Sequence, residues 1–367
     1  MAEKAIRLGG ESTADAIVSA VDTMYSEHTF SGKDFTLKHN DDEIAVDSNF
    51  AAQSFWKDVR VRFFRKKSAV FGMILIILIM LLAIFGPGVN EYTYSGQDLS
   101  QKNFAPRVQV LENFGILNGD EKMSTTTGSK TVNAYQEKGK DDVYYWFGSD
   151  LYGRDIWTRT WEGARVSLII AVAAAVIDMV IGMSYGLISG YFGGKVDMVM
   201  QRFLEVANGI PRLVIVTLLL LVLKPGMATI IFALMLTEWV GMSRIARAEM
   251  LKLKDQEFVL ASRTLGAGSF FIIFKEVLPN IIGPIITQVM FSIPTAIFTE
   301  AFLSFVGLGI PVPQCSLGSL ISELYNSFTT HPYQIIPPIV VMSLLMLSFN
   351  LVADGLREAL DPKMKSM

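Results

Sequence analysis

The chain has 367 residues, of which 51% are hydrophobic and 18% are charged, and its formal net charge is -3. The absence of a basic excess argues against nucleic-acid binding. A single cysteine, Cys315, excludes an intramolecular disulfide. The histidines, His28, His39 and His331, are scattered, so we expect no metal centre. The apolar residues gather in long uncharged runs, which are typical of helices that face lipid rather than of soluble cores.

The N-terminal residues 1–67 are predicted to form a cytoplasmic extension. Residues 1 to about 50 are polar and lack a period, which indicates a weakly ordered or peripheral segment. The sequence FWKDVRVRFFRKK at 55–67 mixes aromatic and basic residues and predicts an amphipathic helix at a membrane surface, or a plain basic flank. The first apolar run begins only near Ser68, so no cleavable signal peptide is expected.

Six apolar segments follow, and the predicted fold class is therefore all-α, a polytopic membrane protein with six transmembrane helices. Residues 68–86 form the first span, 87–165 an extracellular segment, 166–353 a five-helix core and 354–367 a cytoplasmic tail. Within the core we expect spans at about 166–189, 203–223, 227–243, 277–298 and 335–352.

The distribution of basic residues predicts the orientation. The loop at 244–276 is rich in Lys and Arg, whereas residues 300–338 contain neither. By the positive-inside rule this contrast places both termini in the cytoplasm. Arg154, Arg159 and Arg165 then lie on the outer side, against the simple rule. We interpret them as part of an interfacial helix with an aromatic belt of Tyr144, Tyr145, Trp146, Trp157 and Trp161.

The sequence carries no motif for chemistry of its own, so no catalytic residues are expected. It has no H-E-x-x-H, no G-x-S-x-G and no phosphate-binding loop. The nearest approach to that loop, SGYFGGKVD, has Ser189 in place of the first glycine and Val196 in place of the hydroxyl residue. No cofactor is therefore expected in this chain, and any use of ATP must belong to a partner.

The loop at 244–276 contains the most informative pattern. Phe258, Ala261 and Leu265 recur at i, i+3 and i+7, which predicts a short amphipathic helix with Glu257 on another face. Gly266 can end this helix and turn the chain back. On the pattern alone, an ordinary re-entry loop fits as well. Small residues that let another surface approach closely are Ala261, Ser262, Gly266 and Gly268.

The same loop resembles the EAA loop of permeases of ATP-binding-cassette importers, which reads E-A-A, three residues, Gly, and a hydrophobic-Leu-Pro ending. Leu260 replaces the acid and Ser262 the second alanine, while Glu257 lies one turn earlier. The resemblance implies a coupling helix that docks into a cleft on an ATPase. The positions of the pattern are occupied here by Leu260, Ala261, Ser262, Gly266, Leu278 and Pro279.

Four further stretches are similar to the C-type permease subunit of oligopeptide, dipeptide and nickel importers: FGSDLYGRDIWTRTWEGARVSL, SGYFGGKVDMVMQR, EAFLSFVGLGIPVPQCSLGSLI and FNLVADGLREALDPK. The similarity covers about residues 54–365. Residues 315–317 depart from it, because relatives commonly carry a Trp before the following Gly. The resemblance implies the type I importer permease fold and a prokaryotic plasma membrane.

The resemblance also implies partners. These are a homologous second permease, two cytoplasmic subunits that bind ATP and Mg, an extracellular substrate-binding lipoprotein, and a peptide substrate. The expected function is that of a permease subunit in an ATP-driven oligopeptide importer. Dipeptide or nickel transport by the same family is an alternative. A self-contained channel or secondary transporter, and a membrane receptor or scaffold, are rival classes.

Two features inside the spans carry expectations about packing. Gly182, Gly186 and Gly190 repeat G-x-x-x-G on one helical face, which favours close packing of another helix over a merely flexible helix. Pro211, Pro284 and Pro294 interrupt their helices and predict hinges or simple kinks.

Ionisable residues within spans are candidates for the translocation path. Glu205 and Arg212 are seven apart, so on one helix they would share a face. A structural pair between them is the favoured interpretation, and contact of Arg212 with a peptide carboxylate is the alternative. Glu238 and Asp178 raise the same question.

Overall fold

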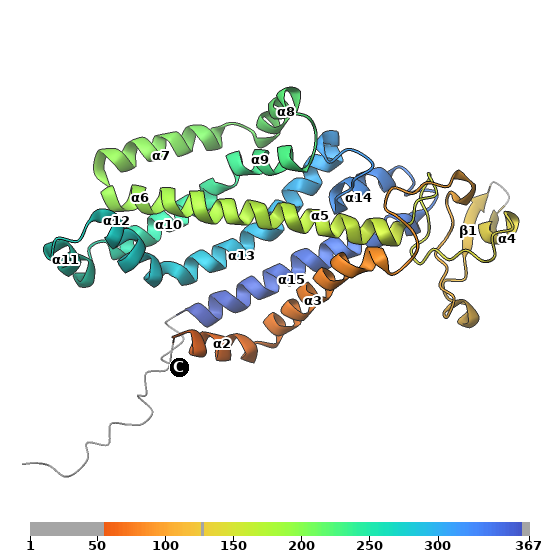
Figure 1. The fold of residues 1–367 in the computed structure, drawn as a ribbon, viewed down its shortest axis with the longest axis horizontal. Helices are drawn as coiled ribbons and strands as arrows, with labels where there is room; N and C mark the ends of the chain where they lie inside the picture. The colour runs from red at the N-terminus through yellow and green to blue at the C-terminus, as the bar shows by residue number, and fades with distance from the viewer. Residues whose placement is uncertain (1–54, 126–127, 362–367) are drawn as a thin grey trace, which may run out of the picture. The chain divides into compact units, whose positions relative to one another are not determined.

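The computed structural model describes residues 55–125 and 128–361 (Figure 1). The polar segment expected at residues 1 to about 50 lies outside the described residues, as do residues 362–367 of the expected tail. Within the described part, one end of a helical bundle carries α2 (Phe55–Arg65), α11 (Glu257–Thr264) and the end of α15 (Ile336–Leu360) (Figure 1). Strand β1 (Asp120–Thr125) and helix α14 (Leu317–Tyr325) lie toward the other end. We call these the α11 end and the β1 end.

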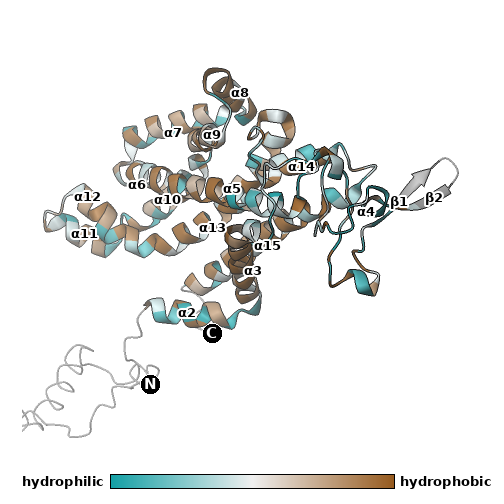
Figure 2. Ribbon diagram, turned by 45° about the vertical axis from the view of Figure 1, so that its right-hand side comes forward, coloured by the Kyte–Doolittle hydropathy of each residue, from teal (hydrophilic) through white to brown (hydrophobic). Residues whose placement is uncertain are grey.

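The first two helices form a short amphipathic helix and a span. Helix α2 (Phe55–Arg65) buries Val59 and Phe63 on one side, as expected of the amphipathic pattern. Helix α3 (Lys67–Phe85) is apolar all round (Figure 2) and packs against α15 (Ile336–Leu360). Gly72 permits this contact, because a Cβ there would lie 2.8 Å from the carbonyl oxygen of Ser348.

The outer segment between the first two spans folds around a small aromatic core of Phe104, Tyr135 and Tyr145. Strands β1 (Asp120–Thr125) and β2 (Gly128–Asn133) pair antiparallel, with Asp120 opposite Asn133, and α4 (Ala134–Glu137) follows. Short 3-10 turns are η3 (Gly86–Gly88), η4 (Leu99–Gln101) and η5 (Glu112–Phe114). The hairpin of β1 and β2 was not predicted, because the sequence indicated helices only.

The second span is part of one long helix. Helix α5 (Ile156–Ile177), the π-helical turn η6 (Asp178–Gly182) and α6 (Met183–Phe192) run on without a break over 37 residues. At 1.5 Å per residue this is roughly 55 Å, well beyond the hydrocarbon thickness of a bilayer. Helix α5 begins at Ile156, so Arg154 lies outside the helix in which it was expected, and Arg154 and Arg159 are both buried within the protein.

The third predicted span is broken rather than straight. Helix α7 (Gly194–Gly209) and α8 (Arg212–Val222) meet at a bend of 77°. Pro211 lacks a backbone N–H, and its ring disfavours helical geometry at the preceding residue. Ile210 accordingly adopts an extended conformation, with φ -84° and ψ 123°.

The remaining chain completes the bundle. Helices α9 (Met227–Thr237) and α10 (Trp239–Leu253) are nearly continuous and lead to α11 (Glu257–Thr264) at the α11 end. Helix α13 (Leu278–Leu303) passes through Pro284 and Pro294 without a break. The chain then returns through α12 (Ser269–Phe271), η7 (Ile272–Val277), α13 (Leu278–Leu303), η8 (Ser304–Leu308), α14 (Leu317–Tyr325), η9 (Pro332–Gln334) and α15.

Among the described residues, five helical segments are long and apolar enough to cross a membrane, or six if α7 and α8 count as one broken span. Five of the six predicted spans thus correspond to continuous helices, and the sixth is the bent pair. Buried residues of α3, α5, α9, α13 and α15 form the largest apolar cluster.

Candidate functional site

Helix α11 is a short helix with a well-defined end. Gln256 is extended, and the helix starts at Glu257. Gly266 ends it with φ +85°, a left-handed conformation that a side chain disfavours. The amide of Ala267 donates to the carbonyl of Ser262, and the amide of Gly266 donates to that of Arg263, both at 3.0 Å. This pair of bonds is a Schellman motif, and it turns the chain sharply after α11.

One side chain of α11 is fully buried against the bundle. Val259 is fully buried in an apolar cluster with Met250, Ile272 and Ile273. The sequence pattern did not indicate Val259, because the spacing of Phe258, Ala261 and Leu265 marks a different face of the helix. A lone buried valine on an otherwise exposed helix gives no period to detect.

The residues of the predicted amphipathic face point outward instead. Leu265 is 88% exposed, and Phe258 and Ala261 are exposed as well. Leu260 on the same helix, and Phe270 and Phe271 on the following α12, are exposed apolar residues too. Ser262 is half-buried, and Glu257, Gly266 and Gly268 are exposed, with no atom near the position of a Cβ at either glycine. An exposed apolar group of this kind is typical of a surface that another protein covers.

Three polar contacts connect the elements around α11. The guanidinium of Arg263 lies over the ring of Tyr191 at the end of α6, 5.4 Å from its centre. Arg247 on α10 donates two hydrogen bonds of 2.6 Å to the carboxylate of Asp197 on α7. Ser189 of α6 donates to the same carboxylate at 2.5 Å. The ends of α6, α7 and α10 are therefore tied together beside α11.

The three glycines of the G-x-x-x-G repeat face α10. A Cβ on Gly186 would lie 2.1 Å from the carbonyl oxygen of Ser243, and one on Gly182 would lie 2.5 Å from that of Trp239. A Cβ on Gly190 would lie 2.9 Å from the Cβ of Met250. The glycine repeat therefore serves close packing, as predicted, rather than flexibility. It lets α10 lie directly against α6, and α10 leads into α11.

The candidate path residues do not pair as the sequence predicted. Because α7 and α8 are bent apart, Glu205 and Arg212 do not share a helical face. Glu205 accepts instead from Arg202 at 2.5 Å, and Arg212 donates to Glu238 at 2.8 Å. Thr299 of α13 also donates to Glu238, at 3.5 Å.

The Arg212–Glu238 pair therefore joins three elements, α8, α13 and the junction of α9 and α10. The side chain of Arg212 is half exposed, whereas that of Glu238 is largely buried.

Asp178 lies buried in η6, and its Oδ1 atom has no hydrogen-bond partner among the described residues. No group of His, Cys, Asp and Glu in the described part of the chain could hold a metal ion.

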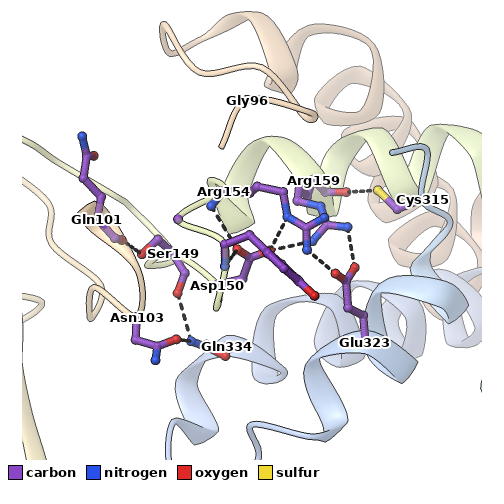
Figure 3. A network of polar contacts seen from close by, with 12 residues as sticks. Gly96, Gln101, Asn103, Ser149, Asp150, Arg154, Arg159, Cys315, Glu323 and Gln334 are labelled. Carbon is purple, nitrogen blue, oxygen red and sulfur yellow. Dashed lines mark hydrogen bonds and ion pairs between the residues drawn. The ribbon is translucent and has the colours of Figure 1, made fainter. Parts of the chain in front are cut away.

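A second polar network joins the outer segment to the bundle at the β1 end (Figure 3). Arg154 and Arg159 both donate to Asp150, at 2.7 and 2.8 Å, and both pair with Glu323 on α14. The thiol of Cys315 lies 3.5 Å from the carbonyl oxygen of Arg159.

Burial alone would raise the pKa of the Glu323 carboxyl, but the guanidiniums of Arg159 and Arg154 outweigh it and hold the pKa below its usual range. Sequence spacing could not reveal this network, because Glu323 is far from the arginines along the chain.

The fold defines an integral membrane protein with several spans and a short exposed helix at one end. Residues 182–366 match the binding-protein-dependent transport system inner membrane component family, and residues 54–106 match the N-terminal transmembrane domain of oligopeptide transport permease C. The chain belongs to this family of inner membrane transport components. The match confirms the expected fold class, the permease function and a multi-pass location in the plasma membrane.

Curated relatives agree with this assignment. The oligopeptide transport system permease protein OppC of Bacillus subtilis (strain 168) is 43% identical over 85% of this chain and 91% of that protein. The dipeptide transport system permease protein DppC of Lactococcus lactis subsp. cremoris (strain MG1363) is 41% identical over 90% of this chain and 97% of that protein. Among solved structures, an inward facing MetNI methionine ABC transporter chain aligns with a TM-score of 0.47 and 16% identity, over 54% of this chain and 94% of that one.

Proposed function

We propose that this permease forms half of the translocation path of an ATP-driven oligopeptide importer, beside a homologous second permease. Two cytoplasmic ATP-binding subunits hold ATP and Mg, and an extracellular lipoprotein delivers the peptide. The observation that carries the proposal is α11: a helix with one buried valine, whose other apolar side chains are exposed at the end of the bundle.

In this proposal α11 is the coupling helix. The ATPase covers Phe258, Leu265 and their apolar neighbours, and burial of such side chains supplies the binding energy. Closure of the ATPases moves α11, and the rigid cluster of α6, α7 and α10 carries that motion into the spans. The two states must differ in contacts with the ATPase for coupling to occur.

The proposal places both termini in the cytoplasm. Supporting this orientation, the basic helix α2 and the basic loop that carries α11 lie toward the same end of the bundle (Figure 1). The outer segment and α14 then face the outside, where the lipoprotein docks.

For the path itself, we propose that Arg212 and Glu238 line the route, and that Glu205 lies nearer its cytoplasmic side. The bend between α7 and α8 supports this, because broken helices in membranes occur where backbone lines a cavity or packs on protein. The half-exposed guanidinium of Arg212 suits transient contact with a peptide carboxylate.

Oligopeptide cargo is favoured by the relative with 43% identity, which is an oligopeptide permease. Dipeptide cargo remains the second candidate, because relatives named as dipeptide permeases reach 41% and 39% identity. Uptake of labelled peptides of two to six residues by a deletion strain carrying this chain separates the two candidates.

A variant pair tests the coupling role. Gly266→Arg should insert normally and yet lose peptide-stimulated ATP hydrolysis and uptake, because it strains the backbone at the end of α11 and adds bulk to the docking surface. Gly139→Arg is the matched control: Gly139 also has a positive φ, +62°, with no atom near its Cβ position, but it lies in the outer segment. Normal coupling in Gly266→Arg, or equal loss in both variants, would contradict the assignment of α11.

A further inference from the structure

A basic pocket lies between α2 and the last turns of α15. Its volume is about 400 Å³, and it is lined by Arg62, Arg65, Lys66, Gly355, Glu358 and Ala359. None of these residues belongs to α11, to the Arg212–Glu238 pair or to the network around Arg159 and Glu323.

The walls of the pocket are held in place by close packing. A Cβ on Gly355 would lie 2.2 Å from the Cβ of Ala69 and 3.3 Å from the ring of Phe63. Helix α15 therefore touches the start of α3 and the buried face of α2 at this point. The pocket is a fixed feature of the corner where these helices meet.

The charge of the pocket is only partly neutralised within the protein. Lys66 pairs with Glu358 at 2.6 Å, and Arg62 pairs with Asp58. Arg65 is exposed and has no ion-pair partner among the described residues. Three further cations of α2 and the start of α3 are exposed without an ion pair in the described part of the chain: Lys57, Arg60 and Lys67.

The surroundings of the pocket indicate where it lies. On α2, Trp56 and Phe64 are exposed although Val59 and Phe63 are buried. On α3, which starts directly beside the pocket, Phe71 and Ile74 are exposed, and no charged residue follows Lys67 in this span. Exposed aromatic residues next to cations at the end of a span are typical of the level of lipid headgroups.

We propose that this pocket binds the headgroup phosphate of an anionic phospholipid. Arg65 and the Lys66 ammonium face the phosphate, and one acyl chain lies along Phe64 and the exposed face of α3. Basic pockets between spans on the cytoplasmic side bind acidic lipid headgroups in this way. The inference requires only that α3 spans the membrane, and it holds for any cargo and for any coupling mechanism.

The test measures lipid association with the full-length chain in its assembled transporter, reconstituted in phosphatidylcholine. In electron paramagnetic resonance spectra, the fraction of lipid that the protein restricts in motion should be larger for spin-labelled phosphatidylglycerol than for spin-labelled phosphatidylcholine. Arg65→Gln should weaken the preference for phosphatidylglycerol about fivefold, which is the expected contribution of one cation near an anionic surface. Arg65→Lys, which keeps the charge, should retain most of the preference.

Lys57→Gln is the matched control, because it removes the same charge from an exposed position on α2 that does not line the pocket. An equal effect of both Gln variants would show diffuse attraction and overturn the site. Two further results would also overturn it: no preference for phosphatidylglycerol in the wild-type chain, or displacement of the lipid by inorganic phosphate at equal concentration, which would show an ordinary anion site. Because ATP-driven uptake is not the readout, a negative result leaves the proposed function intact.

Discussion

Arg159 on α5 and Glu323 on α14 form an ion pair of 2.6 Å, although 164 positions separate them in the sequence. The guanidinium is fully buried, and it also donates to Asp150 at the end of the outer segment. The pair therefore connects three parts of the chain at the β1 end: the outer segment, the start of the second span and the helix between the last two spans.

Arg159→Met should loosen this end of the protein, because it leaves two carboxylates with one remaining guanidinium. Breaking a buried pair costs about 3 kcal/mol, roughly a hundredfold in local opening. Cys315 reports this opening, since it is the only cysteine of the chain and is buried beside Arg159. The rate of its labelling by a thiol reagent should rise accordingly.

The control for this experiment is Glu205→Gln, which removes one partner of the exposed pair with Arg202. Exposed pairs contribute about 0.5 kcal/mol or less, so the labelling rate should hardly change. Equal labelling rates in the wild type and in Arg159→Met would show that the network does not hold the β1 end together.

The stability of the same region should depend on pH. The pKa of Glu323 lies below its ordinary value of 4.5, because the guanidiniums of Arg159 and Arg154 outweigh burial. A carboxyl with a lowered pKa in the folded state stabilises the fold above its ordinary pKa, and this contribution is lost as the pH falls through the lowered value. The midpoint of thermal unfolding, followed by tryptophan fluorescence, should therefore decline in acid below about 4.5.

Glu323→Gln isolates this contribution from those of other carboxyl groups. The variant should be less stable near neutral pH, and the difference from the wild type should shrink as the pH falls. A difference that stays constant from neutral pH to strong acid would rule out an ionised Glu323 as its source.

Gly186→Ala should destabilise the bundle, because the new methyl group would meet the carbonyl oxygen of Ser243 at 2.1 Å. The backbones of α6 and α10 would have to separate, and overpacking of this kind costs typically about 1–3 kcal/mol. Gly241→Ala is the counterpart on α10, where no atom lies within 4 Å of the Cβ position. It should be neutral or stabilising by up to about 1 kcal/mol. Thermal unfolding of the two variants in the same detergent compares them, and similar midpoints would contradict the close contact.

Gly266→Asn and Gly266→Val should differ in coupling. Asn tolerates the left-handed backbone at φ +85°, whereas a β-branched side chain is strained there by about 1–2 kcal/mol or more. The Asn variant should keep most of the peptide-stimulated ATP hydrolysis of the assembled transporter, and the Val variant should lose much of it. Identical activities would mean that the turn after α11 does not require its observed conformation.

Features that depend on local sequence were predictable. Long uncharged runs located the spans, the glycine repeat located the packed face of α6, and Gly266 located the end of α11, because each depends on residues close together in the chain. Pro211 was visible in the sequence too, but whether a proline kinks a helix or breaks it depends on what surrounds it: α13 continues through Pro284 and Pro294, whereas the chain bends by 77° at Pro211.

Features that depend on distant partners were not predictable. The partner of Arg212 is Glu238 rather than Glu205, because the bend removes the shared face on which the expected pair relied. The burial of Arg159 depends on Glu323, which no spacing rule connects to it. Val259 is buried by side chains of α10 and η7, so its role emerges only from the tertiary structure.

The most direct test of the account is transport by reconstituted vesicles. This chain and its partner permease are inserted into liposomes with the lipoprotein outside, and uptake of labelled oligopeptide is measured with and without the ATP-binding subunits and ATP inside. We predict uptake only when both are present, and its loss in the Gly266→Arg variant. Full uptake without the ATP-binding subunits would contradict the account, because it would show that the permease moves peptide without the proteins proposed to drive α11.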